Sequence, residues 1–122
     1  MTDNEKIVRD FIAAWSNLDP GELVDYFTED GVYHNMPMDP VAGREALATF
    51  ISAFLNGWEQ TDWEILNLLA DGDTVMVERM DRTVANGKPV DLPCFGLFQL
   101  RDGKIALWKD YFDMTTYINA LS

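Results

Sequence analysis

Charged residues interrupt the apolar face of two predicted strands in the second half of the chain. Because side chains alternate between the two faces of a strand, Arg79 and Asp81 share a face that continues from two preceding valines. A buried charge is tolerated mainly when it is paired and hydrogen-bonded, so the arrangement of lowest cost places Arg79 between Asp81 and Asp110. The sequence therefore predicts a carboxylate, guanidinium, carboxylate row in an apolar interior. On the last strand, the face that carries the second aspartate comprises Ala106, Trp108, Asp110 and Phe112.

The length and composition define one globular domain over residues 1–122. A chain of 122 residues with 48% hydrophobic content is long enough for one core but too short for two. The 21 acidic residues against 9 basic residues give a net charge of −12, which would repel the phosphates of nucleic acids and of anionic membranes. We therefore expect a neutral, apolar small molecule as the partner, and neither nucleic acid nor membrane.

Cysteine usage and the N-terminal residues narrow the class further. The single cysteine rules out an internal disulfide and a thiolate metal cluster. No apolar run approaches the length of a membrane span, and the first residues are polar and acidic, unlike a secretory leader. These features lead us to expect a cytoplasmic protein.

Helical patterns dominate the first half of the chain. Thr2 and Glu5 form a capping-box pattern ahead of a first amphipathic helix. Asp19, followed by a proline, is typical of the start of a second helix. We expect four helices in all, over about residues 3–17, 20–30, 43–55 and 115–121.

Strand patterns occupy the rest of the chain. A short strand over residues 32–36 places Tyr33 and Asn35 on one face, and a proline-containing turn closes it. After residue 58 the period changes to two, and Asn86-Gly87 is a strong hairpin signal. The next predicted strand presents Trp63, Ile65, Asn67 and Leu69 on one face. Three further strands are expected over residues 74–84, 88–100 and 105–113.

This order of elements predicts an α+β fold. Four consecutive strands favour a curved, mostly antiparallel meander, and helices packed on one side of it would enclose a pocket. Seven inward-facing residues are candidates to line that pocket, with plain core packing as the alternative for each. They are Phe50, Phe54, Leu92, Cys94, Phe98, Trp108 and Phe112. Met36 and Met38 are candidates for an adaptable mouth, with ordinary loop burial as the alternative.

Tyr33 and Asn35 extend the candidate site. A phenol and a carboxamide on one strand face can donate and accept hydrogen bonds, and together with a carboxylate they can hold a water molecule at three points. The alternatives are a core tyrosine with a satisfied hydroxyl and an asparagine that flanks a turn. For the charged row, the alternative is an ion-pair network that only fixes the strand register.

Four segments in order along residues 32–113 carry a resemblance to a known family. They are Tyr33-His34-Asn35-Met36-Pro37, Glu78-Arg79-Met80-Asp81, Gly96-Leu97-Phe98-Gln99-Leu100 and Trp108-Lys109-Asp110-Tyr111-Phe112-Asp113. Together they are similar to the successive motifs of the limonene-1,2-epoxide hydrolase family, within the NTF2-like or SnoaL-like superfamily. The resemblance implies a cone-shaped pocket, a homodimer and a reaction without a cofactor.

The resemblance also implies a role for each candidate residue. In that family an aspartate of the final strand removes a proton from a water held by a tyrosine and an asparagine. A second aspartate protonates the epoxide oxygen, and an arginine bridges the two. By position, Asp110 would be the base, Asp81 the acid and Arg79 the bridge. Tyr33 and Asn35 would hold the water. Where an arginine is frequent in the family this chain has a lysine, Lys109, which falls on the opposite strand face.

The residue types agree with this chemistry. Opening an epoxide with water requires one carboxyl group to take a proton and another to give one. A covalent route needs a separate base, usually histidine, and the single histidine, His34, has the opposite strand parity from Tyr33 and Asn35. Single-step attack by water is therefore preferred. Arg79 takes the charge-neutralising position between the carboxylates, which disfavours a catalytic metal.

Three hypotheses of function follow. The leading one is a cofactor-independent epoxide hydrolase that converts a small, mostly apolar epoxide, such as a terpene or cycloalkene oxide, into a vicinal diol. The second is an isomerase or polyketide cyclase of the ketosteroid-isomerase type, in which an aspartate abstracts a proton next to a carbonyl. The third is a noncatalytic domain for small-ligand binding or dimerisation. Fold alone does not separate them, because one scaffold hosts many functions.

Overall fold

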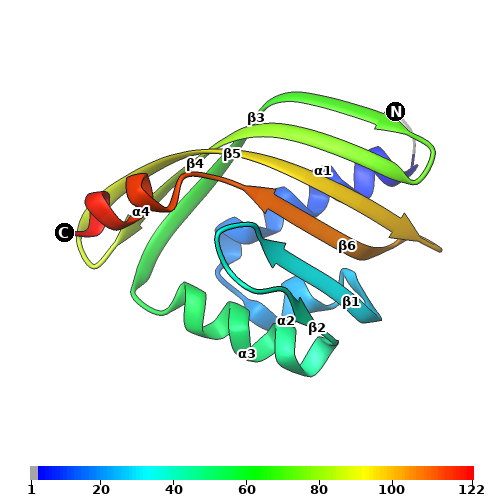
Figure 1. The fold of residues 1–122 in the computed structure, drawn as a ribbon, viewed down its shortest axis with the longest axis horizontal. Helices are drawn as coiled ribbons and strands as arrows, with labels where there is room; N and C mark the ends of the chain where they lie inside the picture. The colour runs from blue at the N-terminus through cyan, green and yellow to red at the C-terminus, as the bar shows by residue number, and fades with distance from the viewer. Residues whose placement is uncertain (1–2) are drawn as a thin grey trace.

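The computed structural model describes residues 3–122, and the predicted capping residue Thr2 lies outside them. Within these described residues, four α-helices, one 3-10 turn and six strands follow one another (Figure 1). They are α1 (Asp3–Ala14), η1 (Trp15–Asn17), α2 (Pro20–Val24), β1 (Phe27–Asn35), β2 (Val41–Ala42), α3 (Arg44–Leu55), β3 (Trp58–Asp71), β4 (Thr74–Ala85), β5 (Lys88–Arg101), β6 (Lys104–Tyr111) and α4 (Met114–Leu121). Within residues 3–122, no helix combines the length and apolar character needed to cross a membrane.

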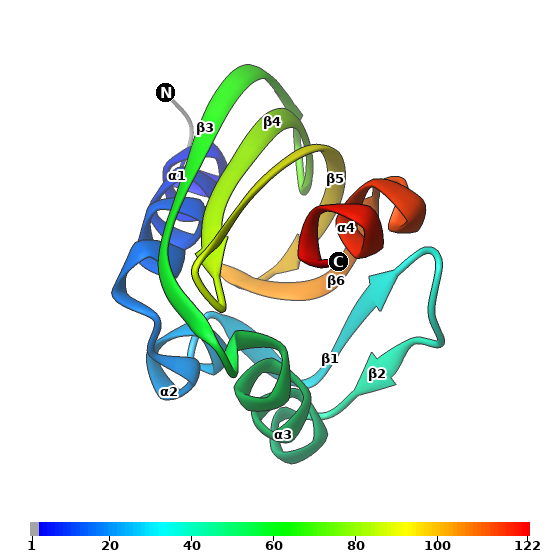
Figure 2. The ribbon, with the colours of Figure 1, turned by 90° about the vertical axis from the view of Figure 1, so that its left-hand side faces the viewer.

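The six strands form one curved sheet in the order β2-β1-β6-β5-β4-β3. Strands β3 to β6 are an antiparallel meander, whereas β1 pairs with β6 in parallel. The long strands β3, β4 and β5 arch over the interior, with α1 and α3 on the concave side and α4 beside the open end (Figure 2). The predicted α+β fold with a curved, mostly antiparallel sheet and helices on one side is confirmed.

Aromatic side chains fill the space between the helices and the concave face. Phe11 and Trp15, one turn apart on the first helical segment, are fully buried. The Phe11 ring meets the Trp108 ring edge-on with centroids 5.1 Å apart, and Trp15 stacks on Trp63 at 4.3 Å. Aromatic pairs in these geometries contribute about 0.5–1.5 kcal/mol each beyond their area burial. The first helix is thereby held against β3 and β6.

The second helix is shorter than predicted. Its start is confirmed, because the Asp19 side chain accepts hydrogen bonds from the backbone N–H groups of Gly21 and Glu22 at 3.1 and 3.4 Å. It ends at Val24 instead of near residue 30, because β1 begins at Phe27, which pairs with β6 and is fully buried. Burial and sheet pairing of this segment override its local helical pattern.

Two register shifts correct the predicted strand faces. In β3 the pairing with β4 shifts between Ile65 and Asn67, so Leu68 faces the interior and Leu69 is 76% exposed. The predicted alternation is therefore wrong beyond Ile65. In β6 a shift opposite residues 99–100 places Ile105, not Ala106, in the core. A bulge adds one residue to a strand and reverses the faces beyond it, which strict alternation cannot anticipate.

Candidate active site

Arg79 forms two-pronged hydrogen bonds with both predicted aspartates. Its Nε and Nη2 atoms donate to Asp81 Oδ1 and Oδ2 at 2.8 and 3.0 Å. Its Nη1 and Nη2 atoms donate to Asp110 Oδ1 and Oδ2 at 2.7 and 2.5 Å. All three side chains are buried, with Arg79 only 1% exposed. The charged row expected from strand parity is therefore present in the structure.

Gly96 makes this arrangement possible. It lies on β5, which separates the arginine strand β4 from the Asp110 strand β6, and it pairs directly with Asp110. A Cβ atom on Gly96 would lie 3.0 Å from Arg79 Nη1 and 3.1 Å from Asp110 Oδ1. Contacts this short are avoided in proteins, so the guanidinium crosses β5 only because this residue has no side chain.

Burial and charge set the protonation of the row. Burial raises the pKa of Asp81 to about 6, while Arg79 acts in the opposite direction. Burial alone would lower the pKa of Arg79, but the two carboxyl groups outweigh it and hold that pKa well above its usual range. The guanidinium also lies over the Trp63 ring, 4.4 Å from its centroid. Asp81 thus holds its proton to a higher pH than an exposed aspartate does.

Tyr33 and Asn35 lie beside Asp110 because β1 runs parallel to β6. Asn35 is in register with Asp110, and Tyr33 is in register with Trp108 and stacks on it with ring centroids 4.1 Å apart. Burial raises the pKa of Tyr33 well above its usual value, so the phenol is neutral. Among the described residues, neither the Oδ1 nor the Nδ2 atom of the buried Asn35 has a hydrogen-bond partner. An unsatisfied buried polar group costs about 1–3 kcal/mol, so a water or a ligand that hydrogen-bonds to this carboxamide would be stabilised here.

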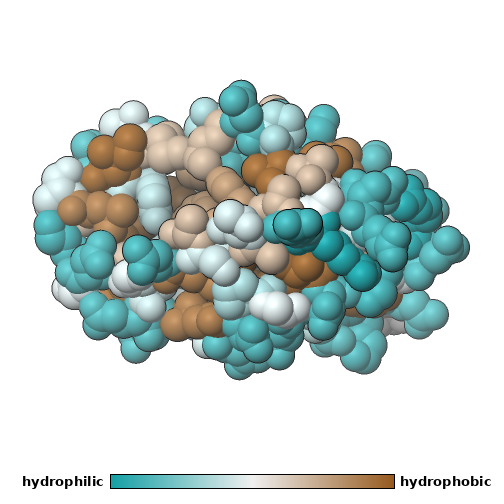
Figure 3. Space-filling model, turned by 90° about the horizontal axis from the view of Figure 1, so that it is seen from below, coloured by the Kyte–Doolittle hydropathy of each residue, from teal (hydrophilic) through white to brown (hydrophobic). Residues whose placement is uncertain are grey.

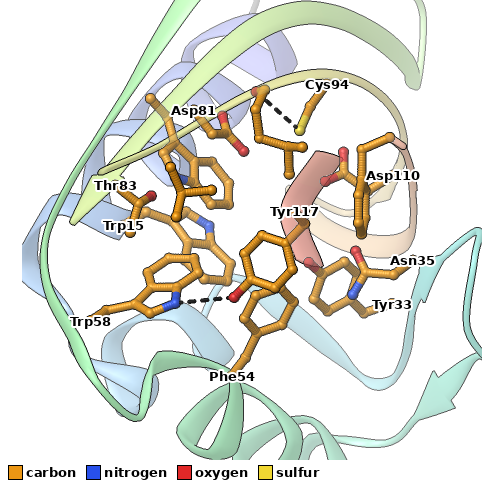
Figure 4. A pocket seen from close by; sticks show the side chains of 14 residues that line it. Trp15, Tyr33, Asn35, Phe54, Trp58, Asp81, Thr83, Cys94, Asp110 and Tyr117 are labelled. Atoms are coloured by element: carbon orange, nitrogen blue, oxygen red, sulfur yellow. Dashed lines mark hydrogen bonds between the residues drawn. The ribbon is translucent and has the colours of Figure 1, made fainter. Parts of the chain in front are cut away.

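The side chains of this site face one cavity, shown in Figure 4 with Asp81 on one side and Asp110, Asn35 and Tyr33 on the other. The centre of a water molecule can occupy about 20 Å³ of it, which is enough for one water. The cavity is lined by Trp15, Tyr33, Asn35, Phe54, Trp58, Trp63, Asp81, Thr83, Val90, Leu92, Cys94, Asp110, Phe112 and Tyr117.

Four of the predicted apolar lining residues are in this set: Phe54, Leu92, Cys94 and Phe112. Three others, Phe50, Phe98 and Trp108, are not in this set. Trp108 and Phe98 are fully buried and stack on each other in the core. Phe50 packs edge-on against the Tyr33 ring with centroids 5.7 Å apart, and Met36, predicted at the mouth, is 36% exposed and is also outside the set.

Sequence patterns missed six lining residues: Trp15, Trp58, Trp63, Thr83, Val90 and Tyr117. Thr83 could have been found, because it follows Asp81 by two positions and strand parity places both on one face. Trp15 and Tyr117 come from helical segments at opposite ends of the chain, and no local pattern indicates that they meet. Tyr117 also accepts a hydrogen bond from Trp58 Nε1 at 3.4 Å across the cavity mouth.

His34 and Lys109 are not among the residues that line the cavity. The Nε2 atom of His34 lies 3.0 Å from the carbonyl oxygen of Met38, to which it can donate in the following turn. Strand parity predicted this, because His34 alternates with Tyr33 and Asn35, and Lys109 alternates with Trp108 and Asp110.

Asp81, Cys94 and Asp110 are the described residues that come closest to a metal site, since one potential ligand atom of each lies within 4.8 Å of the others. Burial raises the pKa of the Cys94 thiol far above its usual value, so it stays protonated. Arg79 already pairs with both carboxyl groups through four hydrogen bonds. These features disfavour a divalent cation at this position.

The curved sheet, its concave helices and the titratable residues facing one cavity together define an NTF2-like domain. Residues 8–108 match the SnoaL-like domain family, and the chain belongs to this family. The family resemblance noted from the sequence motifs is thereby confirmed.

The chain is similar, in sequence and in structure, to epoxide hydrolases described from Mycobacterium tuberculosis. The chain is 31% identical over 107 residues to the epoxide hydrolase EphG of strain ATCC 25618 / H37Rv, covering 88% of this chain and 71% of the relative. It also matches the solved structure of an LEH-like epoxide hydrolase of M. tuberculosis with a TM-score of 0.83 and 27% identity, covering 98% and 92% of the two chains. The chain is therefore a homologue of epoxide hydrolases.

The same fold also occurs in a protein described as a polyketide cyclase. A putative polyketide cyclase from Xanthomonas campestris pv. campestris matches with a TM-score of 0.88 at 21% identity, covering 98% of this chain and 97% of that one. At this identity the likeness shows the fold alone.

Proposed function

We propose that this protein is a cofactor-independent epoxide hydrolase that adds water to a small, mostly apolar epoxide and releases a vicinal diol. The observation that carries the proposal is the single guanidinium that holds two carboxyl groups in one cavity, beside an unpartnered carboxamide. The relationship to EphG supports the same reaction class.

In the proposed reaction a water molecule is held by Tyr33, Asn35 and Asp110. Asp110 takes a proton from this water as its oxygen attacks one epoxide carbon. The carbon–oxygen bond of the ring breaks, and Asp81 gives its proton to the leaving oxygen. The reaction leaves Asp110 protonated and Asp81 ionised, and proton exchange restores both.

The electrostatics support this division of roles. The raised pKa of Asp81 lets this carboxyl group still carry a proton near pH 6. An exposed aspartate has already lost its proton at that pH. Arg79 contacts both carboxyl groups, so it holds them on either side of the reacting atoms and stabilises whichever one is ionised. A covalent ester route is disfavoured because no histidine is among the residues lining the cavity in the described part of the chain.

The cavity wall supports an apolar substrate such as a terpene or cycloalkene oxide. Aromatic and aliphatic side chains surround the charged row, and the chain's net charge of −12 disfavours an anionic ligand. The space in this structure holds a water but not an epoxide, so side chains at the mouth must separate on binding. In Figure 3 apolar side chains gather around a hollow toward the end of the molecule that carries α4.

The test is diol formation by Asp110→Asn and Asp81→Asn variants across a panel of terpene and cycloalkene oxides. We expect each substitution to lower kcat by at least about a hundredfold, because each removes one proton transfer. Asp91→Asn, on the exposed side of β5, is the matched control. Wild-type turnover in both active-site variants would contradict the mechanism. Exchange of an enolisable proton without epoxide turnover would instead indicate an isomerase or cyclase.

We also propose that two copies of the chain associate through the convex face of the sheet. Met76, Phe95 and Tyr111 lie on three neighbouring strands, and each is more than 40% exposed. Phe95 and Tyr111 are direct partners across β5 and β6, so they form a continuous apolar surface. A second copy presenting the same surface would bury it, as expected for a two-fold interface.

A further inference from the structure

Three residues outside the Arg79, Asp81 and Asp110 row form a series of hydrogen bonds that ends at the cavity. The Trp63 indole Nε1 donates to Thr61 Oγ1 at 2.9 Å, and Thr61 Oγ1 lies 2.7 Å from Thr83 Oγ1. Both threonines are buried, at 6% exposure each, but only Thr83 is among the residues that line the cavity. The chain therefore ends at the Thr83 hydroxyl, on the cavity wall.

The indole N–H at the start of this chain limits the possible directions of its hydrogen bonds to two. An indole N–H can only donate, so Thr61 Oγ1 accepts from Trp63 and must direct its own proton elsewhere. Two acceptors are within reach, Thr83 Oγ1 at 2.7 Å and the carbonyl oxygen of Arg82 at 3.4 Å. The 2.7 Å bond forms with either hydroxyl as its donor, and a ligand oxygen that accepts from Thr83 selects the arrangement in which Thr61 donates to Thr83. When Thr61 donates to Thr83, the Thr83 proton has no acceptor in this chain of bonds and is available to a cavity ligand.

The position of Thr83 relates it to the reacting centre. It follows Asp81 by two residues on β4, so the two side chains share a face and their Cα atoms are about 7 Å apart. In Figure 4 both lie on the side of the cavity opposite Asp110, Asn35 and Tyr33. A ligand oxygen bound by Thr83 would lie beyond the Asp81 end of the reacting ring, away from the attacking water.

We propose that Thr83 is a specificity-determining residue that donates a hydrogen bond to a second oxygen of the substrate. This inference rests on the proposed epoxide hydrolase function and refines its substrate class. The favoured substrate is an otherwise apolar epoxide that carries a carbonyl or ether oxygen placed to accept a hydrogen bond from Thr83. A hydrocarbon oxide of the same shape offers Thr83 no acceptor and gains no hydrogen bond there, so the site discriminates against such an analogue.

The experiment compares two epoxides that differ in one atom group. The probes are limonene oxide and the methyl ketone in which its isopropenyl CH₂ is replaced by oxygen. The quantity measured is the ratio of kcat/KM for the ketone to kcat/KM for limonene oxide. In Thr83→Val, which keeps the shape but removes the hydroxyl, we expect this ratio to fall about five- to tenfold, mainly through KM for the ketone. Thr83→Ser should restore most of it.

Two further variants separate binding from a structural role. Thr61→Val removes the donor that orients Thr83 but keeps the Thr83 hydroxyl, so the ratio should fall by a smaller factor. Thr49→Val, exposed on α3, should leave the ratio at the wild-type value. If Thr83 only fastens β4 to β3, Thr83→Val will lower the thermal midpoint while the ratio stays constant, and that result overturns the proposal.

Failure of the hydrolase proposal has a different signature. If the wild-type protein converts neither probe, the Kd of each probe is measured through quenching of the indole fluorescence of the cavity tryptophans. The ratio of these two Kd values then replaces the ratio of kcat/KM values. A preference for the ketone that Thr83→Val abolishes supports the Thr83 donor even then. Equal Kd values for the two probes in the wild-type protein overturn it.

Discussion

Asp81 differs from an ordinary aspartate because of what surrounds its carboxyl group. Its pKa is about 6 in the folded protein, against about 3.9 in an unfolded chain. The folded state therefore binds more protons between these values. The resulting stabilisation is complete below about pH 4 and is lost as the pH rises through about 6, an effect on the order of 3 kcal/mol.

We expect Asp81→Asn to remove this pH dependence. Urea denaturation of the wild-type protein between pH 4 and 7 should show a falling free energy of unfolding, and the variant should show a flatter profile. Asp91→Asn should keep the wild-type slope. Equal slopes in the wild type and Asp81→Asn would show that the Asp81 pKa is not raised. If Asp81 is the catalytic acid, kcat/KM for an epoxide should also fall as the pH rises above about 6, because Asp81 then loses the proton that it donates.

Gly96 should be among the least replaceable residues in the chain. The methyl group of Gly96→Ala would press on Arg79 and Asp110, so we expect a loss of about 1–3 kcal/mol in the free energy of unfolding together with a loss of epoxide turnover. Urea denaturation and diol formation measure the two effects. Gly21→Ala is the matched control, because its Cβ would meet only an Asp19 oxygen at 3.4 Å at the start of a helix. Comparable stability of both variants would contradict the close approach described for Gly96.

Strand parity predicted which site residues share a face within one strand, namely Arg79 with Asp81 and Tyr33 with Asn35. Arg79 and Asp81 follow from strand parity alone, and the cost of buried charge supplies Asp110 as a partner. Gly96 could not be predicted in its role, because that role depends on β5 lying between β4 and β6. The roles of Asp81, Asp110 and Tyr33 in catalysis stay predictions until the variants are assayed.

At the scale of the elements, the antiparallel meander β3 to β6 was predictable from the sequence. The pairing of β1, the strand β2 and the end of α2 were not. Turns such as Asn86-Gly87, where both residues have positive φ, mark the hairpins clearly in the sequence. The parallel pairing of β1 with β6 joins segments more than 70 residues apart, so no local pattern reports it. The short strand β2 and the early end of α2 were missed for the same reason, because tertiary pairing decides them.

The bulge in β3 gives a prediction that distinguishes the structure from simple alternation. Leu68 faces the core and Leu69 is exposed, so Leu68→Ala should cost about 1–2 kcal/mol and Leu69→Ala less than about 0.5 kcal/mol. Urea denaturation of the two variants measures the difference. Strict alternation from Trp63 predicts the opposite order, and observing that order would exclude the register shift between Ile65 and Asn67.

At the scale of the whole molecule, the convex face should control the state of association. We expect the wild-type protein to sediment as a dimer and a Phe95→Glu, Tyr111→Glu double variant to sediment as a monomer, because four like charges would meet across a two-fold interface. Glu45→Gln, exposed on α3, is the control for a surface change elsewhere. A dimer that persists in the double variant would place the interface on another face.

The alternation of side chains along β4 has one more consequence. Met76, Glu78 and Met80 point outward from the same strand whose inward residues include Arg79, Asp81 and Thr83. Successive residues of this strand therefore face different environments. Libraries randomised only at inward positions such as Thr83 can retune which molecules are accepted while the outward surface stays constant, and outward libraries can do the reverse.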